Sequence, residues 1–147
     1  MTRQAPDFTL PSTDGEITLS ALGRKVVLYF YPRDDTPGCT LEAQDFHRLA
    51  AEFEAAETSV IGISKDDLAS HEKFCRKHGL GITLASDTGE VAEAYGVWVE
   101  KNMYGRKSMG IERSTFLISA DGRILREWRK VKVAGHAEEV LEAARLP

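Results

Sequence analysis

A short apolar run followed by a helix start constrains the fold of this chain more than any other feature. Residues 26–30 read Val-Val-Leu-Tyr-Phe, and their length and β-branched content predict a buried strand. Shortly after it, Thr36 and Pro37 form a helix start, with Thr36 as the N-cap and Pro37 at the first helical position. A buried strand that leads into a helix is typical of an α/β sheet, in which functional groups gather at the carboxyl ends of the strands.

Cys39 falls in the first turn of that predicted helix. Unpaired N–H groups and the positive end of the helix dipole favour an anion there, so the sequence predicts a thiol that ionises readily. The alternative is a small buried hydrophobic residue, which is how most intracellular cysteines behave. We favour the reactive cysteine because a packing role does not require a Thr-Pro-Gly turn at a strand end.

The rest of the chain alternates predicted strands and helices. Asp-Gly turns at 14–15 and 121–122 indicate two hairpins, and Gly79 and Gly96 each close a helix. The predicted strands cover residues 7–10, 16–19, 25–31, 59–64, 114–118 and 124–131, and the predicted helices cover 37–55, 66–78, 90–95 and 136–145. This order predicts an α/β, thioredoxin-like fold with an N-terminal β-hairpin extension and a central mixed sheet flanked by helices.

Composition excludes several classes of function. The 147 residues are 42% hydrophobic and 29% charged, with a net charge of −4, which predicts one domain, residues 1–147, with an ordered core. Because no basic block is present we expect no nucleic-acid partner. Neither a membrane-spanning apolar stretch nor a signal-peptide core is found, so we expect a cytoplasmic protein with no membrane partner. We interpret the remaining basic group as protection of an edge strand; it comprises Arg126, Arg129, Lys130 and Lys132.

The segment around Cys39 resembles a known active-site signature. Pro32, Thr36 and Cys39 match the Pro-x-x-x-Thr-x-x-Cys motif of peroxiredoxins. Residues 31–40 with Glu42 are similar to the peroxiredoxin Q or bacterioferritin comigratory protein branch, and the resemblance continues through residues 60–64, 86–87, 95–98 and 110–118. It implies a thiol-dependent peroxidase that reduces hydrogen peroxide and organic hydroperoxides to water and alcohols.

The resemblance also implies roles for individual residues. The Cys39 thiolate would attack the hydroperoxide and become a sulfenic acid. Arg113 would hold the peroxide and stabilise its developing charge, although an arginine on a strand is as often a surface residue. Thr36 would add a hydroxyl hydrogen bond to the peroxide, and Pro32 would shield the thiolate from water. Glu42 would orient Arg113, with a solvated helix glutamate as the alternative.

Cys75 lies inside the second predicted helix, and its role decides the mechanistic subclass. It shares one helical stripe with Leu68, so the residues alone favour a packing cysteine. Many members of the branch carry a resolving cysteine five positions after the first, but that position here is Gln44. A second arrangement in the branch places it on the following helix, and the 36-residue separation of Cys39 and Cys75 resembles that pattern. The resemblance therefore makes Cys75 the candidate resolving cysteine.

The implied cycle closes with an intramolecular Cys39–Cys75 disulfide that thioredoxin or a similar dithiol reduces. A disulfide requires Cα atoms within about 7 Å, so we expect the two cysteines to be apart in the folded state and both helices to unwind locally. Lys73, Arg76 and Lys77 favour a Cys75 thiolate, whereas the negative end of the helix opposes it.

Three other functions remain as alternatives: a one-cysteine peroxidase, a thiol–disulfide oxidoreductase and a non-enzymatic redox sensor. Members of the branch are often monomeric, so we expect a monomer.

His71, Cys75 and His78 share one face of the same predicted helix and raise the question of a metal. A structural zinc site normally has four ligands, and no Cys-x-x-Cys pair supplies the others. We therefore interpret both histidines as helix-surface residues and expect neither a metal nor another cofactor.

Overall fold

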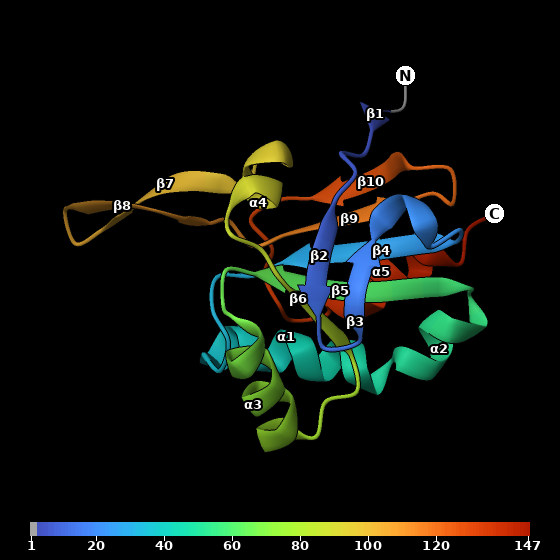
Figure 1. Cartoon of the computed structure of the whole chain (residues 1–147), viewed down its shortest axis with the longest axis horizontal. Helices are drawn as coiled ribbons and strands as arrows, with labels where there is room; N and C mark the ends of the chain where they lie inside the picture. Colours follow the sequence, from blue (N-terminus) through green and yellow to red (C-terminus); the bar gives the residue numbers. More distant parts are fainter. Residues whose placement is uncertain (1–2) are drawn as a thin grey trace.

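The computed structural model describes residues 3–147 and is built around one mixed sheet of eight strands in the order β1-β10-β9-β4-β5-β6-β2-β3 (Figure 1). Strand β4 runs parallel to β5, and β5 runs parallel to β6, whereas β9 runs antiparallel to β4. The strands of this sheet are β1 (Arg3–Gln4), β2 (Thr9–Ser12), β3 (Gly15–Thr18), β4 (Lys25–Phe30), β5 (Thr58–Ser64), β6 (Thr83–Ser86), β9 (Ser114–Ile118) and β10 (Arg123–Trp128).

Strand β4 lies inside the sheet because both of its faces are apolar. Val26, Leu28 and Phe30 belong to one hydrophobic cluster, and Val27 and Tyr29 belong to the other. All five residues are at most 1% exposed. A strand that is buried on both faces is a continuous apolar run, which is why the sequence alone predicts it.

Helices cover both faces of the sheet: α1 (Pro37–Arg48), α2 (Ala50–Ala55), α3 (Leu68–His78), α4 (Glu90–Ala94) and α5 (His136–Ala144), with a 3-10 turn at Leu19–Ala21. Side chains of α1, α2, α3 and α5 form the cluster on one face. The N-terminal hairpin β2–β3 and helix α4 cover the other face (Figure 1). Across residues 3–147, no helix combines the length and hydropathy needed to cross a membrane.

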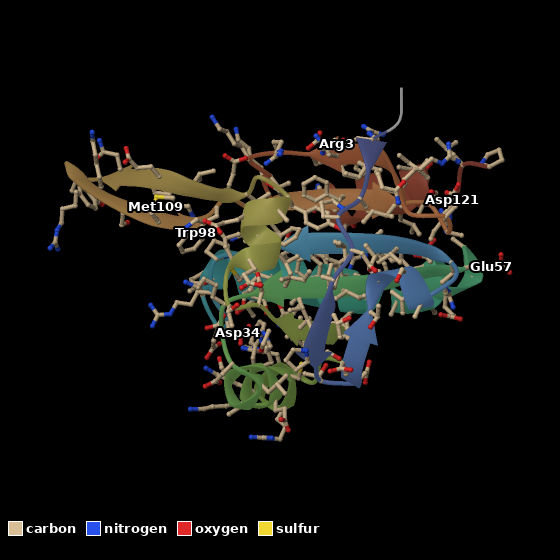
Figure 2. All side chains as sticks on the ribbon, turned by 45° about the horizontal axis from the view of Figure 1, so that its top comes forward. Arg3, Asp34, Glu57, Trp98, Met109 and Asp121 are labelled. Atoms are coloured by element: carbon tan, nitrogen blue, oxygen red, sulfur yellow. The ribbon has the colours of Figure 1, made fainter. Side chains whose placement is uncertain are left out.

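A second, two-stranded sheet projects from the molecule. It consists of β7 (Trp98–Met103) and β8 (Arg106–Ile111) and extends beyond the main sheet in Figure 1. Figure 2 shows Trp98 near its base and Met109 further out. The sequence pattern does not predict this hairpin, because its strands alternate charged residues with few apolar ones, and half-exposed strands of that kind carry a weak pattern. The short strands β1 and β6 were missed as well.

The predicted helix over residues 37–55 is wrong in one respect, because it is two helices. Leu49 separates them with φ −96° and ψ 7°, although its N–H still bonds the Asp45 carbonyl. The apolar spacing continues through Phe53, so the pattern does not reveal the break. The other predicted helices are confirmed within a few residues, and Gly79 ends α3 in a left-handed conformation with φ 62°.

Strand β10 is only partly the edge strand that the basic residues predicted. Arg3 and Gln4 of β1 pair with Ile124 and Arg123, so β1 lies outside the start of β10. Arg126 lies beyond this pairing, where a charged side chain still protects an unpaired edge.

Candidate active site

The loop that follows β4 carries Cys39 to the start of α1. This helix begins at Pro37, and a hydrogen bond from the Thr40 N–H to the Thr36 carbonyl opens it. Cys39 therefore lies in the first turn, as expected, and is buried, with 2% of its surface exposed. The positive end of the helix dipole lies at this turn.

Arg113 supplies a second positive charge at the sulfur. It lies between β8 and β9, close to the end of β4 because Ser114 pairs with Phe30. Its Nη2 donates to Cys39 Sγ at 3.3 Å, and its Nη1 donates to Glu42 Oε1 at 2.6 Å. One guanidinium thus holds the sulfur and a carboxyl group at the same time.

Glu42 is buried, so the alternative of a solvated helix glutamate is wrong. The residue is 1% exposed, and its Oε2 is a buried atom without a hydrogen-bond partner in the described structure. Burial raises the pKa of this carboxyl to about 7, against the opposing effect of Arg113. Burial also works against the Arg113 cation, but Glu42 and Cys39 together raise the pKa of Arg113 above its ordinary value. Glu42 therefore changes charge near neutral pH.

Thr36 occupies the N-cap position of α1, but its side chain does not cap the helix. Its hydroxyl donates to the Arg33 carbonyl at 3.0 Å, so it is engaged within the loop and the prediction of a side-chain cap is wrong. The hydroxyl oxygen keeps its capacity to accept a hydrogen bond. Pro32 lies in the same loop and is exposed. Among residues 3–147, Cys39, Arg113 and Glu42 form one hydrogen-bonded cluster, and neither Thr36 nor Pro32 is bonded into it.

Gly38 also belongs to the site, a role that no sequence pattern predicts. A Cβ atom at this position would lie 3.2 Å from Arg113 Nη2. The missing side chain therefore allows the guanidinium to lie against the first turn of α1. Its place directly before Cys39 is the only sequence signal of this role.

Cys75 lies on α3 and packs, partly buried, against the same hydrophobic cluster as Cys39. Both cysteines are free thiols. Burial raises the pKa of Cys75, and the negative charges of Asp34, Asp14 and Glu72 raise it further. The sequence alone did not decide whether the basic neighbours or the negative helix end has the larger effect on Cys75. In the structure the net effect favours the thiol over the thiolate.

His71 is not a helix-surface residue, and that interpretation is wrong. Its side chain is 0% exposed, with Nδ1 at 2.8 Å from Asp34 Oδ2 and Nε2 at 3.0 Å from the Ala85 carbonyl oxygen. His78 lies near the surface, where its Nε2 is 2.9 Å from Asp35 Oδ1. The helical spacing shows which residues share a face, but not which loop covers it. Within the part of the chain that the structure describes, no group of three or more His, Cys, Asp or Glu side chains is placed to hold a metal ion.

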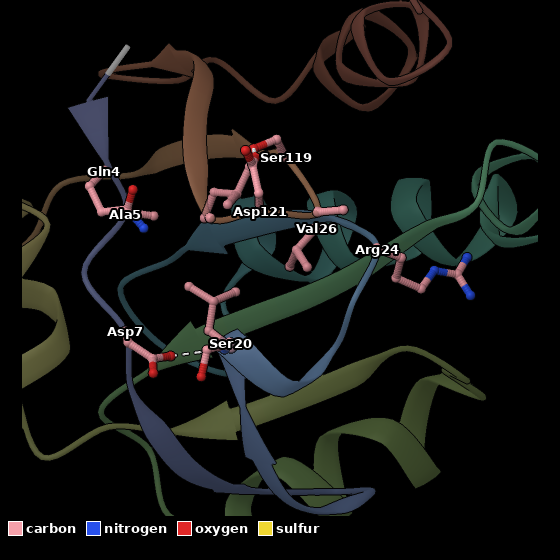
Figure 3. Close-up of a pocket in the computed structure, with 12 residues that line it drawn as sticks. Gln4, Ala5, Asp7, Ser20, Arg24, Val26, Ser119 and Asp121 are labelled. Atoms are coloured by element: carbon pink, nitrogen blue, oxygen red, sulfur yellow. Dashed lines mark hydrogen bonds between the residues drawn. The ribbon is translucent and has the colours of Figure 1, made fainter.

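A cavity of about 170 Å³ lies away from this cluster, at the amino end of β4 (Figure 3). Asp7, Ser20 and Val26 are among its lining residues, and the Ser20 N–H donates to Asp7 Oδ1 at 2.9 Å. Cys39 follows the carboxyl end of the same strand. The predicted site residues do not line this cavity.

Known proteins are similar to this chain in both sequence and structure. The model of the AhpC/TSA family matches residues 1–126. The chain belongs to the AhpC/TSA family. Relatives in it include Peroxiredoxin Bcp of Xanthomonas campestris, 49% identical over 144 residues that cover 95% of this chain and 90% of that protein. Peroxiredoxin Bcp of Bacillus subtilis is 47% identical over 143 residues that cover 95% of this chain and 91% of that protein.

Solved structures of peroxiredoxins show the same fold. Peroxiredoxin Q of Xanthomonas campestris superposes with a TM-score of 0.89 at 48% identity, covering 94% of this chain and 89% of that one. The bacterioferritin comigratory protein of the same organism, studied for alkyl peroxide reduction, has a TM-score of 0.89 at 46% identity, with 94% and 90% covered. Two further structures are cysteine-to-serine variants of that peroxiredoxin Q, at positions 36 residues apart.

These relationships confirm the resemblance read from the sequence. The chain is a peroxiredoxin of the Q or Bcp branch with a thioredoxin-like α/β fold. It is a thiol-dependent peroxidase, an oxidoreductase that reduces peroxides.

Proposed function

We propose that Cys39 is the cysteine that attacks the peroxide and that Arg113 holds the peroxide beside it. The paired contacts of Arg113 carry this assignment: Nη2 lies 3.3 Å from Cys39 Sγ, while Nη1 is fixed by Glu42 at 2.6 Å. A cation beside the sulfur favours the thiolate. The same cation stabilises the negative charge that develops on the peroxide oxygens in the transition state.

In the first step the Cys39 thiolate attacks one oxygen of the hydroperoxide. The S–O bond forms as the O–O bond breaks, and the electron pair leaves with the other oxygen as hydroxide or alkoxide, which takes a proton from water. Cys39 becomes a sulfenic acid. Arg113 and the Thr36 hydroxyl hold the two oxygens in line with the sulfur. Pro32 limits the access of water, and Glu42 keeps the guanidinium of Arg113 in place.

In the second step Cys75 attacks the Cys39 sulfenic acid, and a disulfide and water form. Both cysteines contact the same hydrophobic cluster, and the serine variants of the Xanthomonas relative lie at the same 36-residue separation. Burial raises the pKa of Cys75 in the reduced protein. Opening of α3 therefore serves two purposes, because it brings the sulfurs together and exposes the Cys75 thiol to water.

The cycle is completed by thioredoxin or a similar dithiol, which reduces the disulfide. The substrates are hydrogen peroxide and organic hydroperoxides, and the alkyl peroxide reduction studied in the Xanthomonas relative supports the second class. The chain acts as a single domain over residues 1–147, as a monomer in the cytoplasm, without a cofactor and without a nucleic-acid or membrane partner.

Mass analysis of the reduced protein, quenched within seconds of adding one equivalent of hydrogen peroxide, tests this assignment. Cys39→Ser and Cys75→Ser are the matched variants. In the wild type we expect a peptide that joins Cys39 to Cys75 by a disulfide. Cys75→Ser should instead gain oxygen on Cys39, and Cys39→Ser should not react. Peroxide turnover in the presence of reduced thioredoxin tests the proposed reductant.

Two results would contradict parts of the proposal. If oxygen accumulates on Cys39 of the wild type while Cys75 stays reduced, the protein is a one-cysteine peroxidase and Cys75 is a packing residue. If Cys39→Ser reacts as fast as the wild type, Cys39 is not the attacking cysteine.

A further inference from the structure

A buried pair of ionisable residues joins the Cys39 loop to the helix that carries Cys75. Asp34 lies in the loop before α1, and His71 lies one turn before Cys75 on α3. Their side chains are 3% and 0% exposed, and His71 Nδ1 is 2.8 Å from Asp34 Oδ2. Neither residue belongs to the hydrogen-bonded Cys39–Arg113–Glu42 cluster. Figure 2 shows Asp34 beside α3.

Further hydrogen bonds hold both members of the pair. His71 Nε2 lies 3.0 Å from the Ala85 carbonyl oxygen and donates to it, because a carbonyl only accepts. Asp34 accepts hydrogen bonds from the Tyr31 hydroxyl at 2.6 Å and from the Ser70 hydroxyl at 2.8 Å. The pair is thus a buried, hydrogen-bonded contact between the loop and α3.

The main chain of the loop is fixed at the same place. The Asp34 N–H donates to Asp66 Oδ2 at 2.8 Å, and the Ser64 hydroxyl donates to the same oxygen at 2.7 Å. The Cys39 loop, the end of β5, helix α3 and strand β6 therefore share one hydrogen-bond network. Helix α3 cannot leave the sheet without breaking the Asp34–His71 pair.

We propose that Asp34 and His71 are positioning residues that hold α3 against the Cys39 loop and so set the rate at which Cys75 reaches oxidised Cys39. This proposal rests on the proposed role of Cys75 as the resolving cysteine. Separating the pair breaks a buried hydrogen bond and leaves polar groups without their partners, which disfavours the open state. Cys75 lies four residues beyond His71 on the same helix, so the pair opposes its release.

The step that the pair controls balances without another reagent. The Cys75 sulfur attacks the sulfur of the Cys39 sulfenic acid, the S–S bond forms, the S–O bond breaks, and the hydroxyl leaves with the Cys75 proton as water. The sulfenic sulfur is reduced and the Cys75 sulfur is oxidised. When opening is slow, a second peroxide has time to oxidise the sulfenic acid to sulfinic acid. The pair therefore also governs sensitivity to overoxidation.

The neighbouring residue provides a matched control. Asp35 also bonds α3, through Lys77 at 2.7 Å and His78 at 2.9 Å, but it is 40% exposed. Exposed ion pairs contribute little to stability. Asp35→Asn is the same substitution at the next residue of the loop, and asparagine tolerates the φ of 59° found at this position.

The experiment compares the wild type with Asp34→Asn, His71→Gln and the control Asp35→Asn. Hydrogen exchange of the reduced proteins measures the opening of α3, with α5 as the reference for global unfolding. Rapid-quench mass analysis after a pulse of hydrogen peroxide measures Cys39 oxidation and disulfide formation separately. Ser70→Ala removes one donor to Asp34 and serves as a milder variant if either of the first two does not fold.

In Asp34→Asn and His71→Gln we expect α3 exchange and disulfide formation to be about tenfold faster or more, and overoxidation to decrease, because a buried hydrogen bond that holds α3 is weakened. Cys39 oxidation should stay within about twofold of the wild type, because the Cys39–Arg113–Glu42 cluster is unchanged. Ser70→Ala should give a smaller increase in α3 exchange, and Asp35→Asn should behave as the wild type.

Three results would contradict the proposed role of the Asp34–His71 pair. Equal acceleration of exchange in α3 and α5 would mean that the pair only stabilises the whole fold. Exchange and disulfide formation no faster than in Asp35→Asn would mean that it does not hold α3. A wild type that forms no Cys39–Cys75 disulfide would refute the proposed role of Cys75 as the resolving cysteine. The role of the pair in resolution would then fail as well, even if α3 exchange still responded to the variants.

Discussion

Arg113 donates a hydrogen bond to the sulfur of Cys39 across 3.3 Å, although 74 positions separate them in the sequence. The contact arises because β9 pairs antiparallel with β4, which places the residue before β9 beside the loop that follows β4. The helix start and the guanidinium approach the sulfur from different parts of the chain. Sheet topology therefore places the positive end of a helix and a guanidinium beside one sulfur.

Replacing Arg113 should slow the attack on peroxide far more than it affects folding. For Arg113→Ala we expect the second-order rate constant of Cys39 oxidation to fall by a factor on the order of 10³, because the donor at the developing charge is lost. Arg113→Lys keeps the charge but cannot hold Cys39 and Glu42 with one planar group, so we expect a loss of about 10²-fold. Stopped-flow measurement of the first oxidation step gives both values. A rate for Arg113→Ala within threefold of the wild type would remove Arg113 from the mechanism.

Gly38→Ala should reduce activity without reducing stability. The new Cβ would lie 3.2 Å from Arg113 Nη2, so the guanidinium must move away from its position beside the sulfur. We expect peroxide attack to slow about tenfold, since small displacements of a positioning group have effects of this order. Alanine in a helix is more favourable than glycine by up to about 1 kcal/mol, so the urea midpoint should stay equal or rise.

The matched control for Gly38→Ala is the same change in the Arg113→Ala background. If the methyl group acts by displacing the guanidinium, it should have no further effect on the rate once the guanidinium is gone. An equal loss of rate in both backgrounds would show that Gly38 acts in another way, such as on the helix start itself.

Glu42 should make the protein less stable as the pH rises from about 4.5 to about 7. Its pKa in the folded protein is about 7, above the ordinary value of 4.5, so the folded state binds more protons than the unfolded state between these values. The contribution of Glu42 to the free energy of unfolding therefore decreases from about pH 4.5 to about pH 7, by up to about 3 kcal/mol. Glu42→Gln should lack this decrease, which urea unfolding at several pH values can measure. Parallel curves for the two proteins would contradict the assignment.

The sequence predicts the parts of this fold that depend on a local pattern. The run from Val26 to Phe30 is buried on both faces and carries its own signal, and the Thr-Pro-Gly-Cys segment marks the start of α1 whether or not Thr36 caps it. The break at Leu49 and the β7–β8 hairpin are missed because neither has a local pattern of its own. At Leu49 the apolar spacing continues across the break, and in β7 and β8 few apolar residues mark the strands.

The site depends on contacts between distant segments, which no local pattern contains. The resemblance to peroxiredoxins suggested Arg113 and Glu42 as partners of Cys39, whereas helical spacing alone left Glu42 as a solvated residue. His71 shows the same limit, since its position on α3 does not reveal that Asp34 from the loop covers it. The buried network that links the two cysteine-bearing segments could therefore be found only in the structure.

His136 should give the opposite pH dependence to Glu42. It lies at the start of α5, 6% exposed, with its Nε2 at 2.8 Å from the Thr115 hydroxyl and with the rings of Phe46 and Trp128 packed edge-on against it. Burial lowers its pKa to about 4 from an ordinary value of 6.5. Between these values the unfolded state binds more protons, so the contribution of His136 to stability is complete above about pH 6.5 and is lost as the pH falls toward about 4.

The size of this loss is up to about 3 kcal/mol, and it is measured by urea unfolding of the wild type and His136→Gln across the same pH range. We expect the variant to be less stable than the wild type near pH 7 and to lose less stability on acidification. His47→Gln is the matched control, because His47 is exposed on α1. If His47→Gln reduces the loss of stability at low pH as much as His136→Gln does, burial of His136 is not the cause of that loss. Glu42 and His136 change the free energy of unfolding in opposite directions over overlapping pH ranges, so the pH dependence of the wild type shows only the difference between their contributions. The two single variants are therefore needed to separate these contributions.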